Sequence, residues 1–312
     1  MDAIAHAAAH LRAGGLVVMP TETVYGLAAV ARDADAVGRV FAAKGRPGTN
    51  PLIVHAGTLE MARGCCALWP AEADALARAF WPGPLTLVLP RAEWVPDVVT
   101  AGGGTVAVRV PRHPVALALI DSVGEPLVAP SANRSGYVSP TRVEHVRGVW
   151  SDAEVFVLDG GACEVGLEST VVSVGDDGLR VLRPGVIGAG ALERVASVPV
   201  LGTEEAGGAV ASPGMIGPHY QPRARVVLVR TRDEIDAAMA DGHAVVLPPP
   251  GDSSGAGVSM PAGALAYARE LYAALRGADG AGASVIAVCE PRGEGPVWDA
   301  VRERLRRAAA AR

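Results

Sequence analysis

The stretch Lys44-Gly-Arg-Pro-Gly-Thr-Asn-Pro-Leu-Ile-Val-His55 combines two cations, an amide and a histidine with a short apolar run. Lys44 and Arg46 stand one residue apart in a segment broken by glycine and proline. Both can face inward only if an anion meets them, because a buried charge without a partner is very costly. The alternative is a solvated surface turn. These residues alone favour the surface turn and the anion site equally. The other polar clusters of the chain therefore decide between the two interpretations.

Polar side chains recur beside the other short apolar runs of the first 190 residues. They are Thr21, Thr23 and Tyr25; His55; Thr105, Arg109 and Arg112; Ser131, Asn133 and Ser139; Ser169; and Arg183. In open α/β sheets ligands collect outside strand ends, so several of these groups could converge on one cleft. A lysine with several arginines suits a polyphosphate, and hydroxyl and amide groups suit sugar and phosphate oxygens.

Arg109 lies between Val108 and Val110, and strand alternation points its side chain away from theirs. A buried arginine needs an anionic partner, and a substrate carboxylate would serve. His55 could instead be a hydrogen-bonded core histidine, and Arg183 could be an ordinary ion-pair partner of Glu22 or Glu168. The residues alone therefore predict a cleft for an anionic ligand and nothing narrower.

Hydrophobic spacing predicts the elements that position these groups. In the first 201 residues we expect helices at 3–13, 33–43, 71–80 and 113–122, and strands at 16–19, 52–54, 85–89, 106–110, 127–129, 155–158, 170–174 and 179–182. Short strands interleaved with helices, some joined by hairpin-length turns, indicate an α/β domain with a mixed sheet.

The pattern changes near residue 202. Residues 202–214 are rich in glycine and alanine without periodicity, which is typical of a linker. Strands at 226–229, 244–247 and 285–288 then alternate with helices at 232–241, 262–276 and 297–310, which predicts a small parallel α/β domain. We therefore expect a catalytic domain at 1–201, a linker at 202–224 and a second domain at 225–312.

Composition narrows the classes of function. The 312 residues carry a net charge of −5, so no overall basic field indicates nucleic-acid binding. The four cysteines form no C-x-x-C pair, and the Walker A, H-E-x-x-H and G-x-S-x-G motifs are absent. No apolar run reaches the roughly 18 residues of a membrane span, and the N-terminus lacks a signal-peptide pattern. These features predict a cytoplasmic protein without membrane contact.

Several of the polar clusters belong to longer motifs that occur in a fixed order. These are Pro20-Thr-Glu-Thr-Val-Tyr-Gly-Leu27, Lys44-Gly-Arg-Pro47, Asn50-Pro-Leu-Ile-Val-His55, Trp81-Pro-Gly-Pro-Leu-Thr86, Arg109-Val-Pro111, Pro130-Ser-Ala-Asn133 and Leu167-Glu-Ser-Thr170. As a set they closely resemble the YrdC-like family of L-threonylcarbamoyladenylate synthases, over about residues 5–200. The second half, with Ser212-Pro-Gly-Met215 and His219-Tyr-Gln-Pro222, resembles the long form, in which a linker joins a Rossmann-like C-terminal domain.

The resemblance implies a YrdC-like mixed twisted sheet and a reaction that makes threonylcarbamoyl-AMP and pyrophosphate from L-threonine, bicarbonate and ATP. A downstream threonylcarbamoyl transferase would use the product to form N6-threonylcarbamoyladenosine in tRNA, so that tRNA is only the indirect final acceptor. Magnesium would arrive with ATP, held mainly by phosphates and water and not by protein side chains. A carbamate attacking the α-phosphorus brings two anions together, so the step needs charge neutralisation and alignment more than a nucleophilic side chain.

The match to the family's motifs also implies roles for individual residues. L-Threonine would be held by Thr23, His55, Arg109 and Ser169. ATP would be contacted by Arg46, Asn50, Thr105, Ser131, Asn133, Ser139, Arg183 and Tyr220. Lys44 beside the phosphates and Arg46 would form the catalytic pair. One departure is that Ile216-Gly217-Pro218 stands where the family's linker commonly carries basic residues.

Two other classes of function fit a YrdC-like fold. One is a module that binds RNA without chemistry, which the net charge and the lack of a basic stripe disfavour. The other is a carbamoyl-transfer domain of the kind found in hydrogenase-maturation proteins. The chain has no zinc-finger cysteines or acylphosphatase-like segment to support that alternative.

Overall fold

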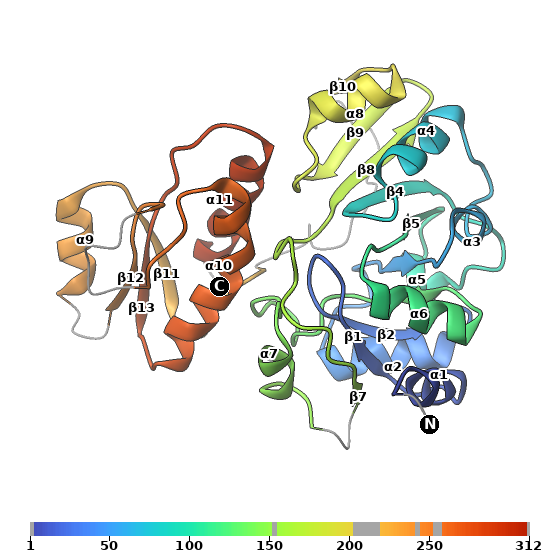
Figure 1. The fold of residues 1–312 in the computed structure, drawn as a ribbon, viewed down its shortest axis with the longest axis horizontal. Coiled ribbons are helices and arrows are strands. Elements are labelled where there is room, and N and C mark those ends of the chain that lie inside the picture. The colour runs from blue at the N-terminus through green and yellow to red at the C-terminus, as the bar shows by residue number, and fades with distance from the viewer. Residues whose placement is uncertain (1–2, 152–154, 202–218, 241–243, 252–257, 311–312) are drawn as a thin grey trace.

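The protein has two sheets, each with its own helices. A computed structural model describes residues 3–151, 155–201, 219–240, 244–251 and 258–310. The larger, N-terminal part lies beside the smaller C-terminal part, and α10 and α11 stand at the junction (Figure 1). None of the helices in the described ranges is long and apolar enough to cross a membrane.

The larger sheet is mixed, and ten strands of the described residues form it in the order β10-β9-β8-β4-β5-β3-β6-β2-β1-β7. The pairs β3–β5, β4–β8, β1–β7 and β9–β10 are parallel, and the remaining neighbours are antiparallel. The strands are β1 (Val17–Met19), β2 (Gly26–Val30), β3 (Ile53–His55), β4 (Leu85–Pro90), β5 (Thr105–Arg109), β6 (Leu127–Val128), β7 (Phe156–Val157), β8 (Thr170–Gly175), β9 (Gly178–Arg183) and β10 (Val200–Leu201).

Helices cover both faces of this sheet. The helices of the larger part are α1 (Ala3–Arg12), α2 (Ala34–Lys44), α3 (Leu59–Arg63), α4 (Ala71–Phe80), α5 (Asp97–Thr100), α6 (Pro114–Val123), α7 (Val143–Arg147) and α8 (Ala189–Ala196). Helices α2, α4 and α8 contribute to one buried apolar cluster, and α1 and α6 contribute to another. Val18 belongs to the first cluster and its neighbours Val17 and Met19 to the second, as the alternation of a strand requires.

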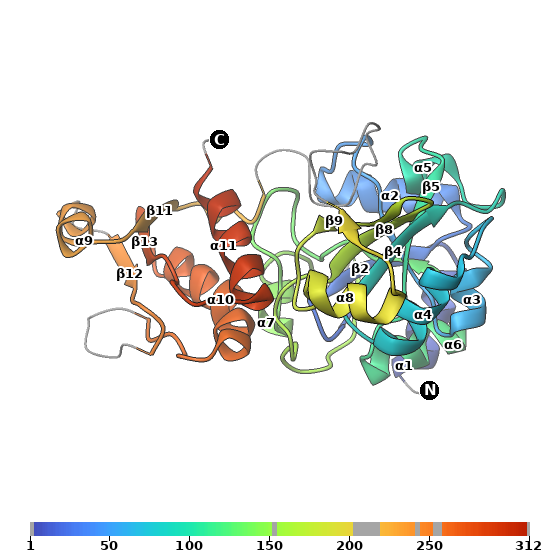
Figure 2. The ribbon, with the colours of Figure 1, turned by 90° about the horizontal axis from the view of Figure 1, so that it is seen from above.

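The smaller sheet is parallel throughout, with the order β11-β13-β12. Its elements are β11 (Arg225–Val229), α9 (Arg232–Met239), β12 (Ala244–Leu247), α10 (Ala264–Gly280), β13 (Val285–Cys289) and α11 (Pro296–Ala309). Helix α9 covers one face, and α10 and α11 cover the face toward the larger part (Figures 1 and 2). The core beneath α10 and α11 also includes Val24, Val138 and Leu167, so it is continuous with loops of the larger part.

The predicted mixed sheet and the predicted parallel second sheet are both confirmed. The sequence analysis missed β2, α3, α5, α7, α8 and β10. Strand β2 is buried along nearly its whole length and reads Gly-Leu-Ala-Ala-Val, so no polar alternation indicates it. The other missed elements have eight residues or fewer, and their hydrophobic periods are too short to detect. The predicted linker segment 202–214 and residues 216–218 lie outside the described residues.

Helix α10 approaches the larger part closely at Gly166. Gly166 has a φ of 74°, and a Cβ placed there would lie 2.4 Å from Cα of Arg269. Any side chain at this position would strain the backbone and push the two parts of the molecule apart. Gly277 lies in α10 as well, but a Cβ there would meet open space.

We expect Gly166→Ala to lower the free energy of unfolding by about 1–3 kcal/mol. The matched change Gly277→Ala should raise it by roughly 0.5 kcal/mol, because alanine loses less backbone entropy than glycine when a helix forms. Urea unfolding of both variants measures the two effects. Equal shifts of the same sign would contradict the close packing at Gly166.

Candidate active site

The polar groups converge where strands of opposite direction meet. Strands β3 and β5 are parallel neighbours, and their last residues, His55 and Arg109, lie directly opposite each other. Strand β4 runs antiparallel to β5 and parallel to β8, so Thr86 near its start lies beside Ser169, which precedes β8. The sheet topology thus gathers four side chains that are spread over more than 100 residues of the chain, from His55 to Ser169.

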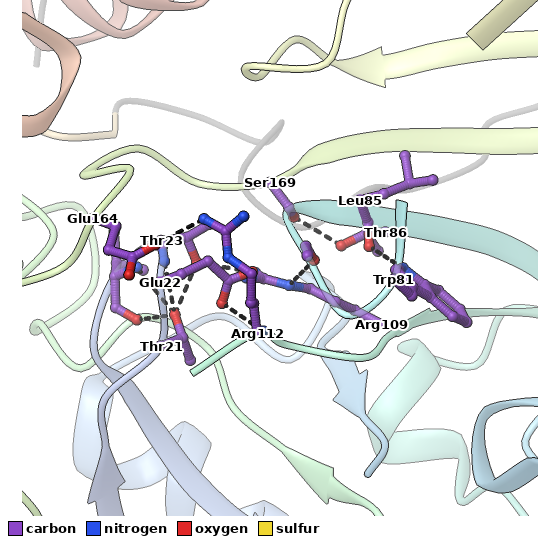
Figure 3. Close-up of polar contacts among 12 residues, drawn as sticks. Thr21, Glu22, Thr23, Trp81, Leu85, Thr86, Arg109, Arg112, Glu164 and Ser169 are labelled. Carbon is purple, nitrogen blue, oxygen red and sulfur yellow. Dashed lines mark hydrogen bonds and ion pairs between the residues drawn. The ribbon is translucent and has the colours of Figure 1, made fainter. Parts of the chain in front are cut away.

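Arg109 is the buried cation of this cluster, and its side-chain partners come from the loop after β1 (Figure 3). Its Nη1 donates to Oγ1 of Thr23 at 2.9 Å, and its Nε donates to the carbonyl of Gly83 at 3.1 Å. Its Nη2 lies 2.6 Å from Oε1 of Glu22, as an ion pair whose two atoms are not aligned as a hydrogen bond. Glu22 thus supplies part of the countercharge for which the sequence analysis invoked a substrate.

Ser169, which the sequence analysis assigned to threonine, contacts Arg183, which it assigned to ATP. Its Oγ lies 2.7 Å from Oγ1 of Thr86 and accepts from Nη2 of Arg183 at 3.1 Å. Arg183 also donates from Nε and Nη2 to the Ser169 carbonyl, at 3.2 and 3.0 Å. Arg183, the last residue of β9, is therefore held against Ser169, the residue immediately before β8.

Helix α2 ends at Lys44 because Gly45 adopts the left-handed conformation, with a φ of 61°. The Lys44 ammonium is buried and donates to the carbonyls of Ser131, at 2.5 Å, and Asn133. Burial and the charges of Arg46 and Arg134 lower the pKa of Lys44. The surface-turn interpretation of Lys44 is therefore wrong, and its direct contacts are to a neighbouring loop.

Arg46 and Asn50 form a second unit at the start of β3. Nη2 of Arg46 donates to Oδ1 of Asn50 at 2.6 Å and to the carbonyl of Pro51 at 2.8 Å. Nε of Arg46 donates to the carbonyl of Asn50 at 3.0 Å. Burial and the charge of Arg183 lower the pKa of Arg46 to about 10, against a smaller opposing effect of Tyr220.

Glu168 is a buried carboxylate whose partners come from both parts of the molecule. Its Oε1 accepts from Oγ of Ser139 at 2.6 Å. Its Oε2 accepts from the hydroxyl of Tyr272 in α10 at 2.9 Å and from Nε of Arg304 in α11 at 3.0 Å. Burial raises the pKa of Glu168, but the charges of Arg304 and Arg183 and the Ser139 hydrogen bond outweigh it and lower the value to about 2.

A cavity of about 50 Å³ joins these groups. Its lining comes from β3, from the loops after β1 and β6, from the ends of β5 and β9, from the turn before β8, and from the segment that precedes β11. The polar and aromatic residues among its lining are Thr21, Thr23, Arg46, His55, Arg109, Ser131, Glu168, Ser169, Arg183, His219 and Tyr220.

The structure brings together most of the residues that the sequence analysis singled out. The four residues assigned to threonine all line the cavity, and so do four assigned to ATP: Arg46, Ser131, Arg183 and Tyr220. Four other residues assigned to ATP or to catalysis do not line the cavity but lie behind its wall. They are Lys44 and Asn50, which are described above, Asn133, which donates to the carbonyls of Arg134 and Tyr137, and Ser139, which donates to Glu168. Thr105 lies at the opposite end of β5 from Arg109, paired with Pro90.

The sequence analysis assigned no ligand to several groups of the site. Thr21, Glu168 and His219 line the cavity, while Thr86 and Glu22 hold residues that do. Glu22 and Glu168 were considered only as partners of Arg183, whereas the structure pairs them with Arg109 and Arg304. Arg304 and Tyr272 belong to a region with no motif, so only the tertiary contact identifies them.

Two aromatic residues close the cavity from the side of the C-terminal domain. Tyr220 is buried at a φ of 64° and stacks on Tyr272, with ring centroids 5.6 Å apart. The Tyr220 hydroxyl and Nδ1 of His219 are buried without a hydrogen-bond partner. Burial and Glu168 raise the pKa of Tyr220 to about 12, so its hydroxyl stays protonated and able to donate.

His55 is neutral under ordinary conditions. Its Nδ1 lies 3.2 Å from the carbonyl of Ile53, and burial together with the charge of Arg109 lowers its pKa to about 3. A neutral imidazole beside Arg109 adds no further positive charge. Because the Ile53 carbonyl can only accept, Nδ1 donates to it and Nε2 is left as a hydrogen-bond acceptor.

The fold and site define a class: an α/β enzyme whose arginine-rich cleft suits an anionic ligand. Comparisons with known proteins identify a particular family within this class. Residues 9–185 match the family described as "Telomere recombination", and residues 187–310 match the family described as "Threonylcarbamoyl-AMP synthase, C-terminal domain". The chain is 40% identical to the threonylcarbamoyl-AMP synthase of Pyrococcus abyssi, over 98% of this chain and 94% of that protein.

Further relatives agree. The threonylcarbamoyl-AMP synthase of Bacillus subtilis is 45% identical over 72% of this chain and 66% of its own length. The crystal structure of P. abyssi Sua5 complexed with L-threonine superimposes with a TM-score of 0.89, at 39% identity, over 99% of this chain and 95% of that one. The chain therefore belongs to the threonylcarbamoyl-AMP synthase family, in the long form with a C-terminal domain.

The lowered pKa of His55 predicts how stability changes with pH. An unfolded histidine titrates near pH 6.5, so below that pH the unfolded state binds a proton that folded His55 does not. As the pH is lowered from about 6 to 4, His55 should reduce the free energy of unfolding by about 1.4 kcal/mol per pH unit. His145 and His219, with pKa values lowered by burial to about 4 and about 3, add to the same trend.

We expect His55→Asn to reduce this slope by the equivalent of one proton, as measured by urea unfolding across the pH range. The exposed His6 provides the control variant His6→Asn. A slope in His55→Asn equal to that of the parent chain would contradict a neutral His55.

Proposed function

We propose that this chain joins L-threonine, bicarbonate and ATP to give threonylcarbamoyl-AMP and pyrophosphate, as the names of its family members imply. The observation that carries the proposal is the charge of the cavity. Arg46, Arg109 and Arg183 line it, while its one lining carboxylate, Glu168, is already paired with Arg304. Such a site attracts anions strongly, and all three substrates carry a carboxylate, a carbonate or phosphates.

Threonine would bind between β3, β5 and the turn before β8. Nη2 of Arg109 is buried without an aligned hydrogen bond, so it can donate to a substrate carboxylate. Thr23, His55 and Ser169 line the same cavity with groups that can bind the amino and hydroxyl groups of threonine. The relative from P. abyssi, which was solved with L-threonine, supports a threonine site in this fold.

ATP would bind beside Arg46 and Arg183, with Ser131 and Tyr220 on the same wall. Asn50, Ser139 and Asn133 would hold that wall, Lys44 would fix it through the Ser131 and Asn133 carbonyls, and Thr105 would contact ATP only if the nucleotide reaches the far end of β5. The cavity is smaller than the roughly 300–1,000 Å³ that ligand sites occupy, so ATP requires the His219 and Tyr220 segment to move outward. The Tyr220 hydroxyl, which has no partner, would then donate to the nucleotide.

The chemistry needs positioning and neutralisation of charge. The threonine nitrogen bonds to the carbon of bicarbonate, and water leaves. An oxygen of the resulting carbamate then bonds to the α-phosphorus, and the bond from that phosphorus to the β-phosphate oxygen breaks, releasing pyrophosphate. Arg46 and Arg183 would balance the charge that develops on the phosphates, and Lys44 would act by holding the loop, without touching the reacting atoms.

Magnesium would enter with ATP. Among the described residues no three His, Cys, Asp or Glu side chains lie close enough to hold a metal, and the Glu168 carboxylate is already engaged by three donors. Phosphates and water would therefore supply its ligands, and the ion would shield the phosphate charge.

The product is a reactive mixed anhydride, so a threonylcarbamoyl transferase acting on tRNA must consume it. We propose a cytoplasmic location for the protein, as the sequence predicts. The domain division is proposed at 201/202 and 224/225, because the larger sheet ends with β10 at Leu201 and the smaller sheet begins with β11 at Arg225. The two family models instead meet near residue 186, before α8 and β10.

The decisive assay is pyrophosphate release from ATP, with threonine and bicarbonate omitted in turn. Release should require both, and mass spectrometry should detect threonylcarbamoyl-AMP. Release that is independent of threonine would favour a carbamoyl-transfer module. Tight RNA binding with no release at all would favour the RNA-binding alternative.

Arg109→Lys should raise the KM for threonine by about tenfold while changing the KM for ATP by less than about threefold. Lysine keeps the charge opposite Glu22, so the fold is preserved, but it cannot contact Glu22, Thr23 and a carboxylate together. Arg112→Lys is the matched control, because the Arg112 side chain is exposed and pairs with Glu164. Equal changes in both KM values would contradict the threonine assignment.

A further inference from the structure

The deepest polar contact between the two parts of the molecule lies at the wall of the active site. Arg304 of α11 has no exposed surface, and its side chain reaches into the larger part. Its Nε binds Glu168, and its Nη1 donates to the carbonyl of Pro184 at 2.9 Å. Glu168 immediately precedes Ser169, and Pro184 immediately follows Arg183; Ser169 and Arg183 both line the cavity.

Arg304 also meets the segment that closes the cavity. Its guanidinium carbon lies 5.4 Å from the centroid of the Tyr220 ring, within the range of a cation–π contact. Tyr220 in turn stacks on Tyr272, whose hydroxyl donates to Glu168. One arginine therefore touches three segments that carry cavity-lining residues: Glu168 and Ser169, Arg183, and Tyr220.

Further polar contacts between the two parts involve residues that do not line the cavity. Arg276 donates to the carbonyls of Val138 and Ser139, and Tyr137 donates to Asp279. Arg142 and Glu270 form an exposed ion pair at 2.7 Å. Arg304 and Tyr272 differ, because both bind the cavity-lining Glu168, and of the two only Arg304 carries a charge.

The charge of Glu168 explains why this contact matters. Arg183 also lies close enough to Glu168 to lower its pKa. If Arg304 did not bind this carboxylate, the charge of Arg183 would be left to balance it, and we expect Arg183 to turn from Ser169 toward Glu168. The arginine proposed for ATP would then be neutralised by the protein itself.

We propose that Arg304 is a positioning residue of the active site, through which the C-terminal domain holds Glu168 and Pro184 and thereby keeps Arg183, Ser169 and Tyr220 in place for ATP. The proposal rests on the function proposed above. It assigns the C-terminal domain a direct part in forming the nucleotide site, in addition to its packing.

The test measures ATP binding by calorimetry, and both KM values by pyrophosphate release, for Arg304→Met, Glu168→Gln and the double variant. Arg304→Met should weaken ATP binding by about tenfold and raise the KM for threonine much less. The double variant contains no unpaired charge, so its loss should be smaller than the product of the two single losses. Arg304→Lys should recover part of the affinity, because it keeps a cation opposite Glu168.

Arg142→Met is the matched control, since it removes a contact between the two parts that does not reach the cavity, and its ATP affinity should equal that of the parent chain. Unchanged ATP affinity in Arg304→Met, or multiplicative losses in the double variant, would overturn the proposal. If Arg304→Met fails to fold, Arg304→Lys should still bind ATP more weakly than the parent chain, and parent-like ATP affinity in both Arg304→Lys and the double variant would overturn the proposal. A parent chain that binds ATP but releases no pyrophosphate would contradict the proposed function while leaving the Arg304 comparison intact.

Discussion

The structure depends on one electrostatic constraint: several cations must stay in a buried cleft while remaining able to meet an anionic ligand. Buried charge is tolerated only with partners, and too strong a partner would remove the attraction for substrate. Two carboxylates take part in this balance. Glu22 balances Arg109, and Glu168, which lines the cavity, is bound by Arg304. Arg46 donates to the neutral oxygens of Asn50 and Pro51, and Arg183 donates to those of Ser169.

The mixed sheet makes this arrangement geometrically possible. Parallel pairing of β3 and β5 places His55 and Arg109 at the same edge of the sheet. Because β4 runs antiparallel to β5 and parallel to β8, the starts of β4 and β8 lie at that edge as well. Ser169 can therefore contact Thr86 and Arg183 at once. The contact with Arg183 joins a residue proposed for threonine to one proposed for ATP. The carbamate and the α-phosphorus must meet, so a shared residue between the two subsites is what such a reaction requires.

The C-terminal domain is part of the same polar network. Its helices α10 and α11 share an apolar core with Val24, Val138 and Leu167, and Tyr272 and Arg304 bind Glu168. Among the described residues, Tyr220 packs between this domain and the cavity. A short-form enzyme that lacks this domain would have to stabilise the equivalent carboxylate in another way.

The sequence by itself determined the two-sheet α/β architecture, the ordered motifs and most of the residues that line the cavity. These follow from local hydrophobic period and from motifs read along the chain, as for His55 and Arg109 at strand ends. Only the tertiary structure decided which charge balances which. Glu22 binds Arg109 across the sheet, Lys44 contacts loop carbonyls, and Arg304 reaches Glu168 from a segment without any motif. Ion pairing depends on distance and burial in space, and residues 136 positions apart leave no sign of it in the sequence.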